Sequence, residues 1–117
     1  MQLLTKELQD RLLANARQQL PLRGTEAELD FLPVVKLFTP DANATWLLTE
    51  LDEDGDTAFG LCDLGLGYPE LGCVSLAELA TVRGALGLPV ERDRYFTADK
   101  PLSAYTEEAT RLRHIRA

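Results

Sequence analysis

The sequence predicts an α+β fold: an antiparallel meander sheet of 3-5 strands with an N-terminal helix, a helix after the last meander strand and a C-terminal helix. An apolar stripe at helical period opens the chain, short β-rich segments separated by turn residues follow, and capping signals precede the two later helices. This order lacks the strand–helix alternation of a parallel sheet. The 117 residues, 45% of them apolar, suit one domain over residues 1–117.

The first helix is expected from Thr5, a good N-cap residue, to about Gln19. Its buried face should carry four residues spaced by four: Leu8, Leu12, Ala16 and Leu20. Pro21 should end the helix, and residues 22–31 read as a connector.

Four strands are expected, over residues 32–38, 45–51, 57–64 and 71–74. Residues 52–56 form a hairpin turn, and residues 91–96 are either a fifth strand or an extended arm. Trp46 is assigned to the core.

The hairpin turn suggests a register in which Asp52 lies opposite Thr57. One face would then be small and mostly apolar, suited to a closely packed helix, and would hold Leu47, Thr49, Leu51, Ala58, Gly60 and Cys62. A slip of one residue would exchange this face with the other one.

Two later helices have capping signals. Ser75 and Glu78 match a capping box, and Gly84 is placed near the end of the helix that follows. Ser103 is a candidate N-cap for the final helix, whose end is basic through Arg111, Arg113 and Arg116.

Charge is distributed unevenly along the chain, whose formal net charge is -7. Residues 37–82 contain nine acidic residues and no basic one, namely Asp41, Glu50, Asp52, Glu53, Asp54, Asp56, Asp63, Glu70 and Glu78. Such a surface repels nucleic-acid phosphates, so direct nucleic-acid binding is not expected. Two interpretations stay open: ordinary solvation of a sheet, or a docking face for a basic partner.

No metal or cofactor site is assigned. Residues 52–56 copy the start of a calcium loop, but its sixth position is Thr57 instead of Gly and its twelfth is Asp63 instead of Glu, so a plain turn is favoured. Cys62 and Cys73 should lie directly opposite each other. They are interpreted either as two small buried hydrophobic residues or as a redox-sensitive pair. Two cysteines are too few to form a zinc site. His114 has no triad partners, so no catalytic residue is assigned.

The chain has neither a signal-like stretch nor an apolar run of membrane-spanning length, so we expect a cytoplasmic protein with reduced thiols and no membrane partner.

Many segments of the chain match a known family in order. They include Val35-Lys-Leu-Phe-Thr-Pro-Asp41, Thr49-Glu-Leu-Asp52, Val74-Ser-Leu-Ala-Glu-Leu79, Gly87-Leu-Pro89 and Glu91-Arg-Asp93. With them, nearly the whole chain resembles a bacterial family described only as domain of unknown function 2958. The resemblance implies a bacterial protein of the kind encoded on plasmids and integrative elements. It implies no activity and no catalytic residue.

Three functions follow as hypotheses. The first is a non-enzymatic interaction or regulatory module that docks a protein with a basic surface, through candidate partner-binding residues Asp41, Glu50, Asp52, Glu53, Asp54, Asp56, Asp63, Arg92 and Tyr95. The second is a small-molecule enzyme using Asp41, Glu50 and Asp63 for acid–base work. The third, ranked last, is nucleic-acid binding by the basic C-terminal helix. A homodimer is a further alternative for the partner.

Overall fold

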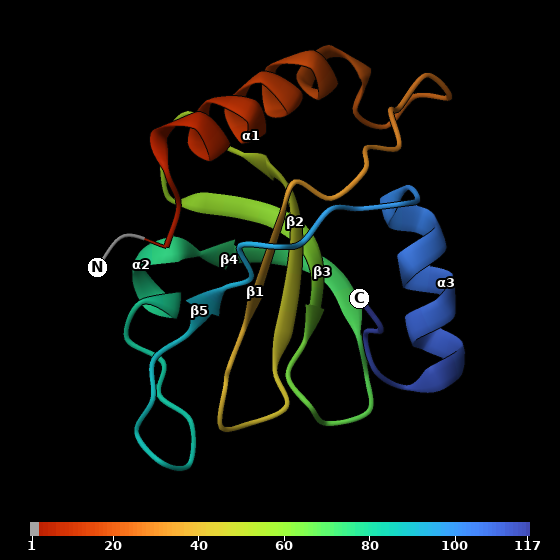
Figure 1. Cartoon of the computed structure of the whole chain (residues 1–117). Coiled ribbons are helices and arrows are strands. Elements are labelled where there is room, and N and C mark those ends of the chain that lie inside the picture. The colour runs from red at the N-terminus through yellow and green to blue at the C-terminus, as the bar shows by residue number, and fades with distance from the viewer. Residues whose placement is uncertain (1–2) are drawn as a thin grey trace.

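A computed structural model describes residues 3–117 as an antiparallel sheet between two helical layers (Figure 1). The sheet contains β1 (Val35–Phe38), β2 (Thr45–Leu51), β3 (Thr57–Asp63), β4 (Glu70–Ser75) and β5 (Glu91–Arg92), in the spatial order β4-β3-β2-β1-β5. The helices are α1 (Lys6–Gln19), the short α2 (Leu76–Leu79) and α3 (Leu102–Leu112), and a 3-10 turn, η1 (Leu20–Leu22), follows α1. The predicted α+β meander with its three helices is therefore confirmed.

Helix α1 begins as predicted, because the Thr5 hydroxyl accepts a hydrogen bond from the Leu8 N–H at 3.2 Å. Leu12 and Ala16 are buried against the sheet. Leu20 was expected on the same face but is 63% exposed, because the chain tightens into η1 at this point and turns the side chain outward.

The β2–β3 hairpin departs from simple pairing at one residue. Beside the turn, the register is as predicted, with Leu51 opposite Ala58 and a 2.9 Å bond from the Asp52 N–H to the Thr57 carbonyl. A β-bulge at Thr49 then shifts the pairing by one residue, so that Trp46, and not Leu47, lies opposite Cys62. The face predicted for Leu47 and Thr49 is wrong for this reason.

The sheet has a separate core on each face, and the bulge decides which β2 residues enter each core. Trp46, Leu48 and Leu51 join Leu12 of α1 in the larger core, which confirms Trp46 as a core residue. On the opposite face, Leu47 and Leu61 pack with α3 residues, including Tyr105 and Ala109. Figure 1 shows α1 and α3 on these two sides of the sheet.

Three other elements differ from their predictions. Ser75 caps α2 by accepting from the Glu78 N–H, but the helix ends at Leu79, well before Gly84. Ser103 is inside α3 instead of capping it, and donates its N–H and its hydroxyl to Asp30 of the connector. The fifth strand is only two residues long and continues as an irregular segment.

Cys62 and Cys73 are not opposite each other. Cys62 pairs with Glu70 and Cys73 with Phe59, so the register places the two thiols on opposite faces of the sheet. Both cysteines are free.

We predict that Gly60 is required by the close approach of β2. A Cβ atom at this position would collide with the backbone carbonyl of Leu47, whereas a Cβ at Gly72, directly opposite on β4, would meet nothing. Gly60→Ala should lower the free energy of unfolding by about 2 kcal/mol, and Gly72→Ala should leave it unchanged or slightly raised. Urea denaturation of both variants measures this, and equal effects would contradict the prediction.

Candidate functional site

Residues 52–56, which we call the acidic turn, include two carboxylates that are held in place by hydrogen bonds, those of Asp54 and Asp56. Asp54 accepts hydrogen bonds from the N–H groups of Asp56 and Thr57, both at 2.8 Å, and from the Thr57 hydroxyl at 2.7 Å. These bonds, led by the one from the Thr57 side chain, hold the pKa of Asp54 below its ordinary value. Gly55, at a φ of 72°, completes the turn.

Asp56 ties the acidic turn to α2. Its carboxylate accepts the Ser75 hydroxyl at 2.6 Å and the Ala77 N–H at 2.8 Å, and its backbone carbonyl accepts the Leu76 N–H at 2.9 Å. The carboxylate therefore caps the first turn of α2, where helix N–H groups have no partner within the helix.

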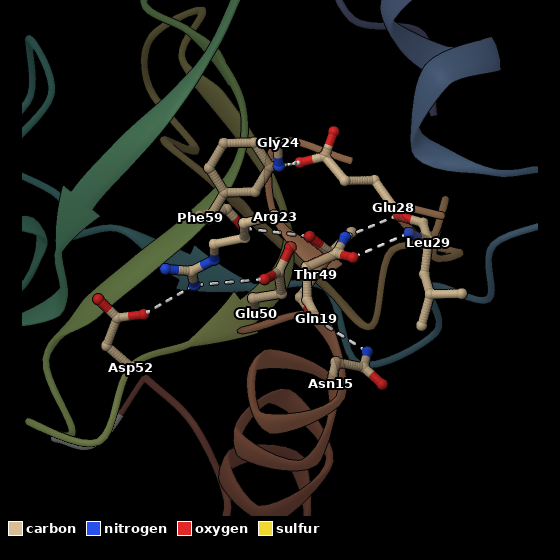
Figure 2. Close-up of polar contacts among 10 residues, drawn as sticks. All are labelled: Asn15, Gln19, Arg23, Gly24, Glu28, Leu29, Thr49, Glu50, Asp52 and Phe59. Carbon is tan, nitrogen blue, oxygen red and sulfur yellow. Dashed lines mark hydrogen bonds and ion pairs between the residues drawn. The ribbon is translucent and has the colours of Figure 1, made fainter. Parts of the chain in front are cut away.

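Two arginines from the end of α1 and its connector face the acidic turn. Arg17 pairs with Glu53, with an Nη2–Oε2 distance of 3.0 Å, and both side chains are exposed. This pair lowers the pKa of Glu53, first through the hydrogen bond from Arg17. Arg23 lies between Asp52 and Glu50, at 3.6 and 3.7 Å (Figure 2).

Glu50 is the buried member of this group, at 5% exposed. Burial raises its pKa, an effect that the charge of Arg23 partly opposes. Figure 2 shows the polar contacts around it: the Asn15 amide donates to the Thr49 carbonyl, and Gln19 exchanges hydrogen bonds with Leu29 of the connector. The connector that carries Arg23 is thereby fixed beside Glu50.

A hollow of about 270 Å³ lies between the end of α1 and the acidic turn. Ala16 and the exposed Leu20 supply its apolar wall. Its charged rim is formed by two bases and two acids: Arg17, Arg23, Asp52 and Glu53. An apolar wall beside the carboxylates of Asp52 and Glu53 suits the aliphatic stem and cationic head of a lysine or arginine that takes the place of Arg17.

The remaining predicted residues lie elsewhere. Asp41 accepts the N–H groups of Leu86 and Leu88, at 2.6 and 3.2 Å, and holds that loop. Arg92 donates to the Leu3 carbonyl at 2.7 Å and anchors the start of the chain, while Tyr95 is exposed. The structure therefore gathers Glu50 with the acidic turn and leaves Asp41, Arg92 and Tyr95 outside this group.

Asp63 is 2% exposed and links the sheet to the end of the chain. Its carboxylate accepts the Gly65 N–H at 2.8 Å and the Ile115 N–H at 3.0 Å. It also lines a wider cavity of about 590 Å³ together with Lys36, Asp93, Arg113 and His114. Lys36 and Asp93 form an ion pair there, at 3.6 Å.

Sequence reasoning missed Arg17, Leu20 and Arg23. The charge pattern of residues 37–82 does not include the two arginines, and the helical period places Leu20 on the buried face of the first helix. Arg17 and Glu53 are 36 positions apart, so no local pattern indicates their pairing. The base-free segment 37–82 was the one available signal, because carboxylates that become buried or fixed need cations from other parts of the chain.

No group of three or more His, Cys, Asp or Glu side chains that could hold a metal ion occurs within residues 3–117. Over the same range, no helix has the length and apolar character needed to span a membrane.

We predict that replacing Glu50 by Gln stabilises the protein at neutral pH. The folded pKa of Glu50 is raised above the ordinary value of 4.5, so its contribution to stability is present below that value and is lost as the pH rises through the folded pKa. A glutamine side chain carries no charge to bury, and its carbonyl oxygen can still accept a hydrogen bond from Arg23. Urea denaturation over a pH series should show a gain for Glu50→Gln at neutral pH that disappears in acid. A variant less stable than the parent at neutral pH would mean that the Arg23 pair outweighs the burial of charge.

Comparison with known proteins gives a family without an assigned role. A family model described as "Protein of unknown function (DUF2958)" matches residues 3–116. No curated protein and no solved structure matches the chain. The family model covers nearly the full length of the chain, which confirms the predicted resemblance. The chain therefore belongs to the DUF2958 family of proteins of unknown function.

Proposed function

We propose that this protein is a non-enzymatic interaction module that docks a basic partner at the hollow beside the acidic turn. The observation that carries the proposal is the pairing of an exposed apolar side chain, Leu20, with the carboxylates of Asp52 and Glu53 around one hollow. The acidic turn carries four carboxylates, and two cations, Arg17 and Arg23, pair with members of it.

The ion pair between Arg17 and Glu53 at the rim can be exchanged. Arg17 and Glu53 are both well exposed, and exposed pairs contribute about 0–1 kcal/mol. A lysine or arginine from a partner can therefore replace Arg17 at little cost, while its stem covers Leu20. The hydrogen bonds within the turn keep Asp54 and Asp56 in place, so docking requires little reordering of the turn.

The carboxylates considered for acid–base chemistry support an interaction role more than an enzymatic one. Asp41 holds the loop at Leu86 and Leu88, Glu50 faces Arg23, and Asp63 holds Gly65 and Ile115. The three therefore belong to separate hydrogen-bond networks, whereas a general acid and base must converge on one substrate position.

We predict that reversing one charge at the hollow weakens docking, whereas reversing an equivalent charge elsewhere does not. Glu53 and Glu70 are both exposed acids of the base-free segment, but Glu70 begins β4 at the far end of the β3 strand from the acidic turn. A hexa-arginine peptide titrated into the isotope-labelled protein should shift amide resonances of residues 16–23 and 52–54. Glu53→Lys should weaken binding about fivefold or more, since it removes one attraction and adds one repulsion of up to about 1 kcal/mol.

Glu70→Lys serves as the matched control, because it changes the net charge by the same amount. A protein captured from bacterial lysate by the parent chain and by Glu70→Lys, but not by Glu53→Lys and not at high salt, would support the proposal. Equal weakening by both variants, or peptide-induced shifts spread over the whole acidic surface, would overturn it.

A further inference from the structure

The two edges of the sheet are built differently. At one edge, β5 has two residues, Glu91 and Arg92, and charged side chains continue beyond it. Short, charged edges of this kind resist pairing with other strands. At the other edge, β4 is six residues long, and Glu70 is its one charged residue.

The hydrogen-bonding groups of β4 that face outward can be identified. The Leu76 N–H bonds the Asp56 carbonyl at 2.9 Å, which makes 56 and 76 a hydrogen-bonded pair of the β3–β4 ladder. Because such pairs alternate along an antiparallel ladder, Gly72 and Val74 point their backbone groups toward β3. Leu71 and Cys73 therefore direct their N–H and C=O groups to the open edge. Ser75 directs only its N–H there, because its C=O accepts the first hydrogen bond of α2.

The side chains at this edge are also uncovered. Leu71 is 48% exposed although its β3 partner Leu61 is fully buried, and Cys73 is exposed. No lysine or proline lies within β4 to block pairing, and both occur commonly on protected edges.

We propose that β4 pairs with β4 of a second copy of this chain, forming an antiparallel dimer with one continuous ten-stranded sheet. A two-fold axis perpendicular to the sheet places a residue opposite its own copy. With Cys73 at the axis, Leu71 lies opposite Ser75 of the other copy, and all three outward-facing residues are used. This arrangement forms about four backbone hydrogen bonds between the copies.

The charges of the strand favour a second copy in this register. Glu70 lies opposite the position of Leu76 in the other copy, so no two carboxylates meet across the axis. A parallel arrangement would set Glu70 beside its own copy, and like charges side by side destabilise a sheet. Ser75, at one end of this pairing, also bonds Asp56 of the acidic turn, whereas Cys73 and Leu71 lie farther along β4.

Sedimentation velocity of the full chain over a range of concentrations tests the proposal. We expect a monomer–dimer equilibrium in the micromolar range that persists at high salt, which separates it from docking at the acidic turn. Cys73→Pro should abolish the dimer, because it removes an outward N–H without removing a bond to β3. Leu71→Lys should weaken it at least tenfold, whereas Leu86→Lys, at another exposed leucine, should have no effect.

A second measurement tests the dimer without relying on the folding of variants at the β4 edge. In a Cys62→Ala background, a short bismaleimide should join Cys73 to Cys73 of the other copy, since paired Cα atoms lie about 5.5 Å apart. In the parent chain Cys62 should react slowly, because burial raises its pKa to about 11. A chain that stays monomeric at the highest concentration, a Cys73→Pro variant that folds and still dimerises, or a dimer without the cross-link would each overturn the proposal.

Discussion

The β-bulge at Thr49 is the constraint on which the arrangement of this protein depends. Without the extra residue, Leu48 and Leu51 would point to opposite faces of the sheet, and one of them would leave the core beneath α1. With it, both leucines face α1, while Leu47 and Glu50 face the other side. Two hydrogen bonds hold the bulge. The Asn15 amide donates to the Thr49 carbonyl, and the Thr49 hydroxyl donates to the Phe59 carbonyl. The position of Glu50 beside Arg23 follows from it.

Carboxylates have a structural role throughout this fold. Asp30, Asp41, Asp54, Asp56 and Asp63 each accept at least one backbone N–H that regular structure leaves without a partner. These bonds satisfy backbone N–H groups at the start of α3, at the start of α2, in two turns and in one loop. Part of the acidity of segment 37–82 is therefore explained by backbone N–H groups that need a carboxylate as acceptor. The proposed docking surface is confined to the acids that remain exposed at one end of the sheet.

The elements of the fold were predictable from local patterns, but its exceptions were not. The hairpin at Asp52 and the helix caps at Thr5 and Ser75 each depend on residues close together in sequence, and each is confirmed. The bulge, the capping of α3 by Asp30 and the outward turn of Leu20 depend on contacts between distant segments. The candidate site was predicted in part: its carboxylates were identified, but Arg17 and Arg23 were not, because nothing local links them to Asp52 and Glu53.

The connection of Asp63 to Ile115 has a consequence for the order in which the chain acquires its structure. Strands β1 to β4 pair with their neighbours in sequence, so each hairpin closes a short loop and loses little chain entropy. The bond from the Ile115 N–H to Asp63 spans 52 residues, and the one from Lys36 to the Ala117 carbonyl spans 81. A growing chain can therefore complete the meander and its α1 layer early, whereas the opposite layer can close only after residues 102–117 have been synthesised.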